Sequence, residues 1–313
     1  MSPDRQTRVQ TRFIEANGLR FETDVAGEGD RFALLLHGFP ENKYSWRFQI
    51  PMLAEAGCTV WAPNLRGYGR SSRPPARSAY GLEHLTADVV ALLAAAGRER
   101  PYRERILIGH DWGAAIAWAA AMEKPAPIDR LVILNVPHPA LMRRGLGTAR
   151  QLLKSWYIGF FQLPLLPELA LGARGADAVG RAFADTVRDR RNFTDADLAV
   201  YRAAAAAPGA LTAMLNYYRA NIANPLMRAV SSESAPRIEI PTLVIWGEAD
   251  HALGKELTVG TDRFVTDLTL RRLPGVSHWV QQEAPEMVNA MLAAFLAGDP
   301  VPDASTVRTD IEA

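Results

Sequence analysis

Residues 105–115 read Arg-Ile-Leu-Ile-Gly-His-Asp-Trp-Gly-Ala-Ala, and this stretch decides the fold. Its apolar run Ile-Leu-Ile is typical of a strand buried on both faces, and the Ala-rich residues from Trp112 onward favour a buried helix. Asp111 therefore lies at the joint between strand and helix, with Gly109 and Gly113 two residues to either side. Because so sharp a turn brings two backbones together, Cβ atoms at the two glycines would collide.

Asp111 occupies the nucleophile position of a G-x-Nu-x-G elbow, where serine is the more familiar residue. The start of the following helix supplies free N–H groups and a positive potential, which help to keep a carboxylate ionised. A helix N-cap is the alternative interpretation, because Asp is favoured at that position too. This stretch alone does not separate the two, and the rest of the chain decides.

The chain of 313 residues is long enough for one large domain, or for one domain with an insertion. Its formal net charge is only +1, so nucleic acid is not an expected partner. The single cysteine, Cys58, cannot form an internal disulfide, and the N-terminus lacks an apolar signal segment. No apolar run approaches the ~18 residues of a membrane helix. We therefore expect a cytoplasmic protein without membrane insertion.

Strand-like and helix-like segments alternate through most of the chain, which predicts a mostly parallel sheet with helices on both faces. An Asn-Gly pair at 17–18 predicts a hairpin between the first two strands. The expected strands are 13–16, 19–25, 32–36, 58–63, 106–108, 130–135, 242–246 and 268–273. The expected helices outside the middle of the chain are 44–56, 82–96, the Ala-rich helix from Trp112 and 285–296.

Two loops follow strands and should lie at the carboxyl edge of the sheet, where open α/β folds bind their ligands. The first, 37–40, reads His-Gly-Phe-Pro, and its glycine permits a sharp turn. The second, 65–72, is glycine-rich but lacks the G-x-x-x-x-G-K-[ST] pattern. We interpret the second loop as a structural turn and not as a phosphate-binding loop.

Three motifs now carry a resemblance: His-Gly-Phe-Pro at 37–40, Gly-Tyr-Gly-x-Ser at 67–71 and Gly-His-Asp-Trp-Gly at 109–113. Together they resemble the α/β-hydrolase superfamily. Residues 39–51 are similar, nearly word for word, to its epoxide hydrolase branch. The resemblance covers most of the chain and implies an α/β-hydrolase fold, a mostly parallel central sheet flanked by helices, with an inserted helical cap.

The middle of the chain breaks the alternation and favours helices only. The expected helices there are 149–161, 176–187, 195–206 and 209–222. With the resemblance, this predicts a core domain of residues 1–138 and 237–300, a cap domain of residues 139–236 and a loose C-terminal tail of residues 301–313. In the family the cap closes a mostly apolar pocket.

Asp250 and His278 each follow a strand, so we expect both at the edge of the sheet that carries Asp111. The chain order of nucleophile, acid and base is the one expected of α/β-hydrolases. Glu248 competes with Asp250 for the acid position, and the register of the family favours Asp250. The resemblance likewise places the base at His278, before the final helix.

Two tyrosines of the expected cap, Tyr157 and Tyr218, fall where the family carries the tyrosines that point at the epoxide oxygen. A neutral phenol is a suitable acid for an alkoxide, which is a much stronger base than phenolate. Packing at a helix interface is the alternative role for both residues. Tyr217 lies next to Tyr218, so the second assignment is open by one residue.

We therefore expect an epoxide hydrolase that forms a covalent ester on Asp111, with water then activated by His278 and Asp250. Backbone N–H groups of Phe39 and Trp112 are expected to hold the oxyanion. The expected substrate contacts are His37, Pro40, Trp112 and Trp279. No metal or organic cofactor is expected, and the partner is a small apolar epoxide, bound by a monomer or homodimer.

A haloalkane dehalogenase is the main alternative, because the Trp112 indole N–H beside the nucleophile suits a halide ion. Two features argue against it. Those enzymes usually carry Asn at the position of Phe39, and this sequence has the paired tyrosines Tyr157 and Tyr218. A haloacetate dehalogenase would need arginines after Asp111, and the sequence has Trp-Gly-Ala-Ala. A non-catalytic ligand sensor on the same fold is the alternative of a different class.

Overall fold

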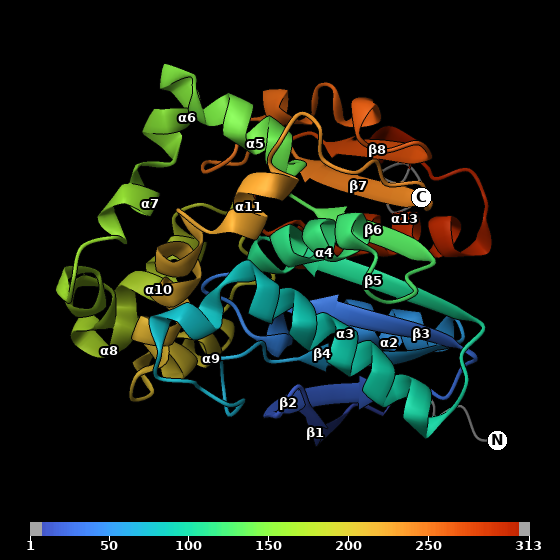
Figure 1. Ribbon diagram of the computed structural model, residues 1–313, viewed down its shortest axis with the longest axis horizontal. Helices are drawn as coiled ribbons and strands as arrows, with labels where there is room; N and C mark the ends of the chain where they lie inside the picture. The colour runs from blue at the N-terminus through green and yellow to red at the C-terminus, as the bar shows by residue number, and fades with distance from the viewer. Residues whose placement is uncertain (1–7, 307–313) are drawn as a thin grey trace.

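The computed structural model describes residues 8–306, and within them an eight-stranded sheet has the order β1-β2-β4-β3-β5-β6-β7-β8 (Figure 1). The β1–β2 and β2–β4 pairs are antiparallel, and the remaining pairs are parallel. The predicted mostly parallel sheet is thus confirmed. The strands are β1 (Gln10–Ala16), β2 (Leu19–Ala26), β3 (Arg31–Leu36), β4 (Cys58–Pro63), β5 (Glu104–His110), β6 (Arg130–Leu134), β7 (Thr242–Gly247) and β8 (Leu268–Leu273).

Helices cover both faces of the sheet, because its central strands are apolar on both sides. Leu34 of β3 packs in one hydrophobic cluster, whereas its neighbours Ala33 and Leu35 pack in another, as the two-residue period of a strand requires. Figure 1 shows α3 and α4 on the nearer face and α2 and α13 behind the sheet. The helices outside the segment between β6 and β7 are α2 (Gln49–Glu55), α3 (Leu82–Glu99), α4 (Trp112–Glu123), α12 (Val280–Glu283) and α13 (Pro285–Ala297).

The chain between β6 and β7 is helical, as predicted, and we call α5–α11 the helical insertion. Its helix α9 has the expected bounds, and it begins with a capping box between Thr194 and Asp197. The expected helix 149–161 is instead two helices that meet at Ser155, whose hydroxyl accepts a hydrogen bond from the Gln151 side chain. The helices are α5 (Pro139–Leu146), α6 (Ala149–Lys154), α7 (Trp156–Phe160), α8 (Leu166–Ala184), α9 (Asp195–Ala206), α10 (Ala210–Asn221) and α11 (Pro225–Val230).

Two short segments differ from the prediction. The first half of the expected helix 44–56 is a 3-10 turn, so that only α2 is α-helical there. Within the expected loose tail, Val301 and Ala304 are buried, and the Arg271 guanidinium donates to the Val301 carbonyl. Residues 307–313 of that tail lie outside the described residues. This turn is η1 (Lys43–Trp46), and the other 3-10 turns given bounds in residues 8–306 are η2 (Arg77–Tyr80), η3 (Lys255–Thr258) and η4 (Thr261–Arg263).

In residues 8–306, no single helix is both long and apolar enough to cross a bilayer, although α9 and α10, bent by 79°, would pass by length and composition as a pair. In the same residues, no group of three or more His, Cys, Asp or Glu side chains is placed to hold a metal ion.

Candidate active site

Asp111 lies at the turn between β5 and α4, in the strained conformation that a nucleophile elbow requires (φ 48°, ψ −122°). The two flanking glycines are needed for steric reasons. A Cβ on Gly109 would lie 2.5 Å from the Gly113 carbonyl oxygen, and a Cβ on Gly113 would lie 2.0 Å from the Leu36 carbonyl oxygen. Asp111 occupies the N-cap position of α4, but its side chain makes no capping hydrogen bond. The geometry is therefore that of the elbow and not of a simple cap.

The loop after β3 brings a backbone donor to the Asp111 carboxylate. The Phe39 N–H donates to Asp111 Oδ1 at 2.7 Å, and the Phe39–Pro40 peptide bond is cis. A Cβ on Gly38 would lie 2.2 Å from Asp111 Cβ, so only glycine permits this approach. The other expected donor belongs to Trp112, the first residue of α4.

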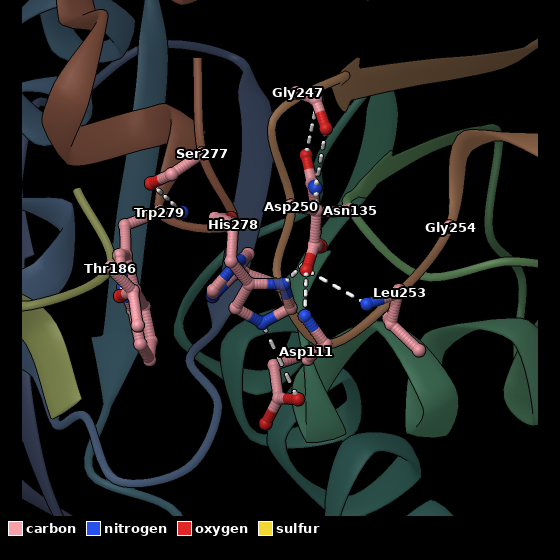
Figure 2. Close-up of polar contacts among 12 residues, drawn as sticks. Asp111, Asn135, Thr186, Gly247, Asp250, Leu253, Gly254, Ser277, His278 and Trp279 are labelled. Carbon is pink, nitrogen blue, oxygen red and sulfur yellow. Dashed lines mark hydrogen bonds and ion pairs between the residues drawn. The ribbon is translucent and has the colours of Figure 1, made fainter. Parts of the chain in front are cut away.

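His278 lies between the two aspartates (Figure 2). Its Nδ1 is 2.6 Å from Asp250 Oδ2, and its Nε2 is 3.7 Å from Asp111 Oδ2. The other oxygen of Asp250 accepts the N–H groups of Ala252 and Leu253 at 2.7 and 2.8 Å, which fixes the carboxylate. The competing acid, Glu248, instead pairs with Lys255 at 3.3 Å. The residues predicted as nucleophile, acid and base thus meet at one edge of the sheet.

The three side chains form a buried arrangement of charges. Burial by itself lowers the pKa of His278, but the Asp250 and Asp111 carboxylates outweigh it and raise this pKa to about 10. Burial likewise raises the pKa of Asp111, but the positive charge of His278 and the hydrogen bond from the Phe39 N–H help to outweigh it, so the net shift is downward. At neutral pH the site therefore holds an anionic Asp111 beside a cationic His278.

Asn135 completes the acid side of the site, and the sequence analysis did not identify it. Its Nδ2 donates to Asp250 Oδ2 at 2.8 Å, and its Oδ1 accepts the Gly247 N–H at 2.7 Å (Figure 2). Asn135 directly follows β6 and has a positive φ of 49°. A polar residue at the carboxyl end of an apolar strand is the sequence signal that could have identified it.

Glu41 was also missed, and it joins the oxyanion loop to the base. This fully buried carboxylate accepts the Gly38 N–H at 2.8 Å and lies 2.7 Å from His110 Nδ1. The other ring nitrogen of His110 lies 2.9 Å from the His278 carbonyl oxygen. His110 therefore faces away from the cavity side of Asp111 and supports the loops on either side of it.

A cavity of about 520 Å³ opens over Asp111 and Trp112, between the sheet edge and the helical insertion. Tyr157 and Tyr218 both line it, with ring centroids 6.1 Å apart, and burial raises the pKa of each phenol. Tyr217 is fully buried elsewhere, and its hydroxyl donates to the Arg66 carbonyl at 2.8 Å. Of the two adjacent tyrosines, Tyr218 is the one that faces the cavity. Apolar side chains in the wall include Val136, Met142, Leu146, Ile158, Ile222 and Met227.

Three residues expected to contact substrate are not in the cavity wall. His37 is fully buried, with Nδ1 2.9 Å from the Gly38 carbonyl and Nε2 accepting the Leu65 N–H, so its ring supports the loop. Trp279 points away, because its indole N–H donates to Thr186 at 2.9 Å. Pro40 is buried and does not line the cavity. Of the four predicted substrate contacts, only Trp112 lines the cavity.

Comparisons with known proteins match most of the chain to one fold family. The model of the α/β-hydrolase fold family matches residues 34–285. The chain is 37% identical to the AB hydrolase superfamily protein YfhM of Bacillus subtilis, over 92% of this chain and 98% of that one. It is 37% identical to epoxide hydrolase 4 of Mus musculus, over 90% of this chain and 78% of that one.

Solved structures give the same result. Epoxide hydrolase A of Mycobacterium thermoresistibile superposes with a TM-score of 0.80 at 32% identity, over 94% of this chain and all of that one. An inhibitor complex of the Bacillus megaterium epoxide hydrolase superposes with a TM-score of 0.83 at 28% identity, over 91% of this chain and all of that one. The chain belongs to the α/β-hydrolase family. Within that family it falls in the epoxide hydrolase branch.

Proposed function

We propose that this protein is an epoxide hydrolase that converts an epoxide to a vicinal diol through an ester on Asp111. The observation that carries the proposal is the pair of phenol groups, Tyr157 and Tyr218, in the wall of the cavity that Asp111 faces. A carboxylate nucleophile and two neutral acids in one apolar cavity suit a substrate whose leaving oxygen needs a proton. In this proposal residues 139–236 act as a cap domain over the core.

In the first half-reaction, a carboxylate oxygen of Asp111 attacks a ring carbon, and the carbon–oxygen bond of the ring breaks. The released alkoxide takes a proton from a phenol, and burial keeps both phenols protonated until then. Ester formation removes the negative charge of Asp111, so the pKa of His278 falls and His278 releases its proton, which restores the phenol. The enzyme now holds an ester, a neutral imidazole and two neutral tyrosines.

In the second half-reaction, His278 takes a proton from water, and the hydroxide adds to the carbonyl carbon of the Asp111 ester. The Phe39 N–H, which donates to Asp111 Oδ1 at 2.7 Å, is in place to stabilise the oxyanion, together with the Trp112 N–H. Collapse breaks the bond between the carbonyl carbon and the substrate oxygen, and the departing alkoxide takes the proton of the added hydroxyl group. The product leaves as the diol, with an oxygen that belonged to Asp111. The carboxylate and the protonated His278 are regenerated, so one water molecule is consumed for each diol.

The test follows the oxygen atom. With enzyme in excess over styrene oxide in water labelled with oxygen-18, the first diol should be unlabelled, and the label should appear in the Asp111 peptide. Direct attack of water on the epoxide would instead label the first diol and would contradict the ester. The Asp111→Ala variant should give no diol while remaining folded. Normal turnover by that variant would contradict the nucleophile assignment.

Trp112 favours a second candidate, a haloalkane dehalogenase, because its indole lies in the cavity wall beside Asp111. The intact mass of His278→Ala after mixing with substrate separates the two candidates. Styrene oxide should add its whole mass at Asp111. An alkyl adduct formed only from a bromoalkane, with release of bromide, would favour the dehalogenase. If neither substrate formed an adduct or was turned over by the wild-type protein, a ligand sensor would be the better description.

A further inference from the structure

The outer edge of the helical insertion carries exposed apolar side chains. In residues 8–306, eight large apolar side chains are more than half exposed, and six of them lie within residues 152–169. We call these six the apolar rim: Leu152, Leu153, Trp156, Leu165, Leu166 and Leu169. We infer that the apolar rim and the basic residues around it form a docking surface for an anionic lipid bilayer. This surface is separate from the reaction in the cavity and goes beyond the proposed function.

The apolar rim follows three successive helices. Figure 1 shows α6, α7 and α8 along the left edge of the molecule, on the side of the insertion away from the sheet. On α7, the Trp156 ring lies 5.9 Å from the half-buried Phe160 ring. A Cβ on Gly159 would meet no atom within 4 Å, so the outer side of α7 is open. Where α8 begins, the third rim leucine lies four and three residues after the other two, so these leucines share one side of the helix.

Contacts on the inner side of α6 fix which of its side chains face outward. Gln151 is buried and donates to the Ala252 carbonyl at 2.8 Å. Lys154 Nζ donates to the Asp250 carbonyl at 2.8 Å. Both contacts belong to the loop that carries the predicted acid. The two rim leucines between Gln151 and Lys154 in the chain are therefore left exposed on the outer side of α6.

Two members of the apolar rim indicate what kind of partner covers it. Leu165 has a φ of 60°, in the region that favours glycine, and its side chain is 72% exposed. Burial within the described residues does not offset the cost of that backbone conformation, so an apolar partner outside the chain gives the leucine a role. Trp156 is 66% exposed, and the indole group favours the interface between water and lipid.

The segment that carries the apolar rim is basic. Residues 139–175, from the start of α5 to the kink in α8, contain five basic residues and one acidic residue, whereas the whole chain has 35 and 34. The acidic residue, Glu168, already lies 2.6 Å from Arg219. Glu256, from outside the segment, lies 3.3 Å from Arg150, and the cations remain in excess. The basic residues are Arg143, Arg144, Arg150, Lys154 and Arg174.

These charges favour an anionic bilayer over a second copy of the chain. In a two-fold dimer both copies present the same surface, so each would meet a surface with the same excess of positive charge. Lipid phosphates instead supply the opposite charge, and each cation near them strengthens binding about fivefold. Such a contact needs no spanning helix, because apolar side chains of this kind enter only the headgroup boundary.

The docking surface borders the cavity. Tyr157 and Ile158 line the cavity on the same short helix that carries Trp156. Ile222, another of the eight exposed side chains, also belongs to the cavity wall. A bilayer seated on the apolar rim therefore lies beside an apolar cavity, and a ligand dissolved in the lipid has a short path into it.

The test measures cosedimentation with lipid vesicles, without any substrate. Wild type should bind vesicles of phosphatidylcholine and phosphatidylglycerol in equal parts, and should bind pure phosphatidylcholine more weakly. Leu153→Glu and Leu169→Glu, each alone, should weaken binding to the mixed vesicles about tenfold or more. Val9→Glu makes the same charge change at an exposed apolar residue beside the edge strand β1, and this control should bind like wild type. Arg174→Gln should weaken binding to mixed vesicles about fivefold and leave binding to pure phosphatidylcholine unchanged.

Fluorescence quenching shows which face touches the lipid. Of the seven tryptophans, Trp156 is the one that is more than half exposed. Phosphatidylcholine with brominated acyl chains, mixed with phosphatidylglycerol, should quench the tryptophan emission of wild type. The quenching should be lost in Trp156→Phe. Equal quenching in both proteins would place the bilayer on another face and would overturn the inference.

The remaining outcomes are equally decisive. Absence of vesicle binding by wild type would overturn the inference, and so would equal binding to neutral and mixed vesicles. A dimer that Leu153→Glu dissociates, without vesicle binding, would make this face an interface between copies. Circular dichroism should show each variant folded, because the changed side chains are exposed. Since no turnover is measured, failure of the epoxide hydrolase proposal leaves this result unaffected, and the reverse holds too.

Discussion

Replacing Asp111 by Asn should lower the pKa of His278, because the substitution removes one of the two carboxylates that keep this imidazole protonated. Asp111 Oδ2 is 3.7 Å from His278 Nε2, and the two side chains are only 16% and 10% exposed. At that distance, one unit charge on each group gives about 1 kcal/mol at the dielectric of water and about 4.5 kcal/mol at an effective dielectric of about 20. This range corresponds to about one to three pKa units.

The expected pKa of His278 is therefore about 10 in the wild type and about 7 to 9 in Asp111→Asn. The assay is an NMR titration of the imidazole Cε1 protons, with the His278 signal assigned by its loss in His278→Gln. Tyr157→Phe, which alters the same cavity without changing its charge, should leave the midpoint where it is in wild type. The same midpoint in wild type and Asp111→Asn would refute the electrostatic argument.

The titration matters for the order of the reaction. Esterification of Asp111 removes the same negative charge as the Asn substitution does, so Asp111→Asn represents the electrostatic state of the ester. A base whose pKa is about 10 in the free enzyme and lower in the ester gives up its proton more readily once there is an ester to hydrolyse. The free site, in contrast, holds Asp111 as an anion ready for attack.

Three further predictions concern single positions. Gly113→Ala should lower the free energy of unfolding in urea by at least about 3 kcal/mol, since the new Cβ would lie 2.0 Å from a backbone oxygen. As a control, Gly97→Ala on an open face of α3 should raise the free energy of unfolding by about 0.5 to 1 kcal/mol. Tyr218→Phe should slow single-turnover ring opening about tenfold or more, while Tyr217→Phe should keep the rate and lose about 1 to 2 kcal/mol of stability; the reverse pattern would exchange their roles. Asn135→Ala should lose about 1 to 3 kcal/mol of stability and slow ester hydrolysis more than ester formation; equal effects on both steps in rapid-quench experiments would argue against its acting through Asp250.

The sequence predicted the sheet well because each central strand is a short apolar run, buried on both faces and followed by a turn. The elbow was predicted for an equally local reason, since its two glycines and its nucleophile lie within five residues. The helical insertion was predicted less completely. α5 and α11 were missed because each is short and begins with proline.

The side chains that support the site depend on contacts between distant parts of the chain, and a local pattern does not encode these. Asn135 is 115 positions from Asp250, and Glu41 is 240 positions from Gln281, which donates to it at 2.8 Å. For His37, the position of the loop was predicted from the sequence but the direction of the side chain was not. Its ring turns inward and forms hydrogen bonds with the backbone of Gly38 and Leu65. Position along a strand predicts which edge of the sheet a residue reaches. Which way its side chain then points is decided by partners that only the folded chain brings together.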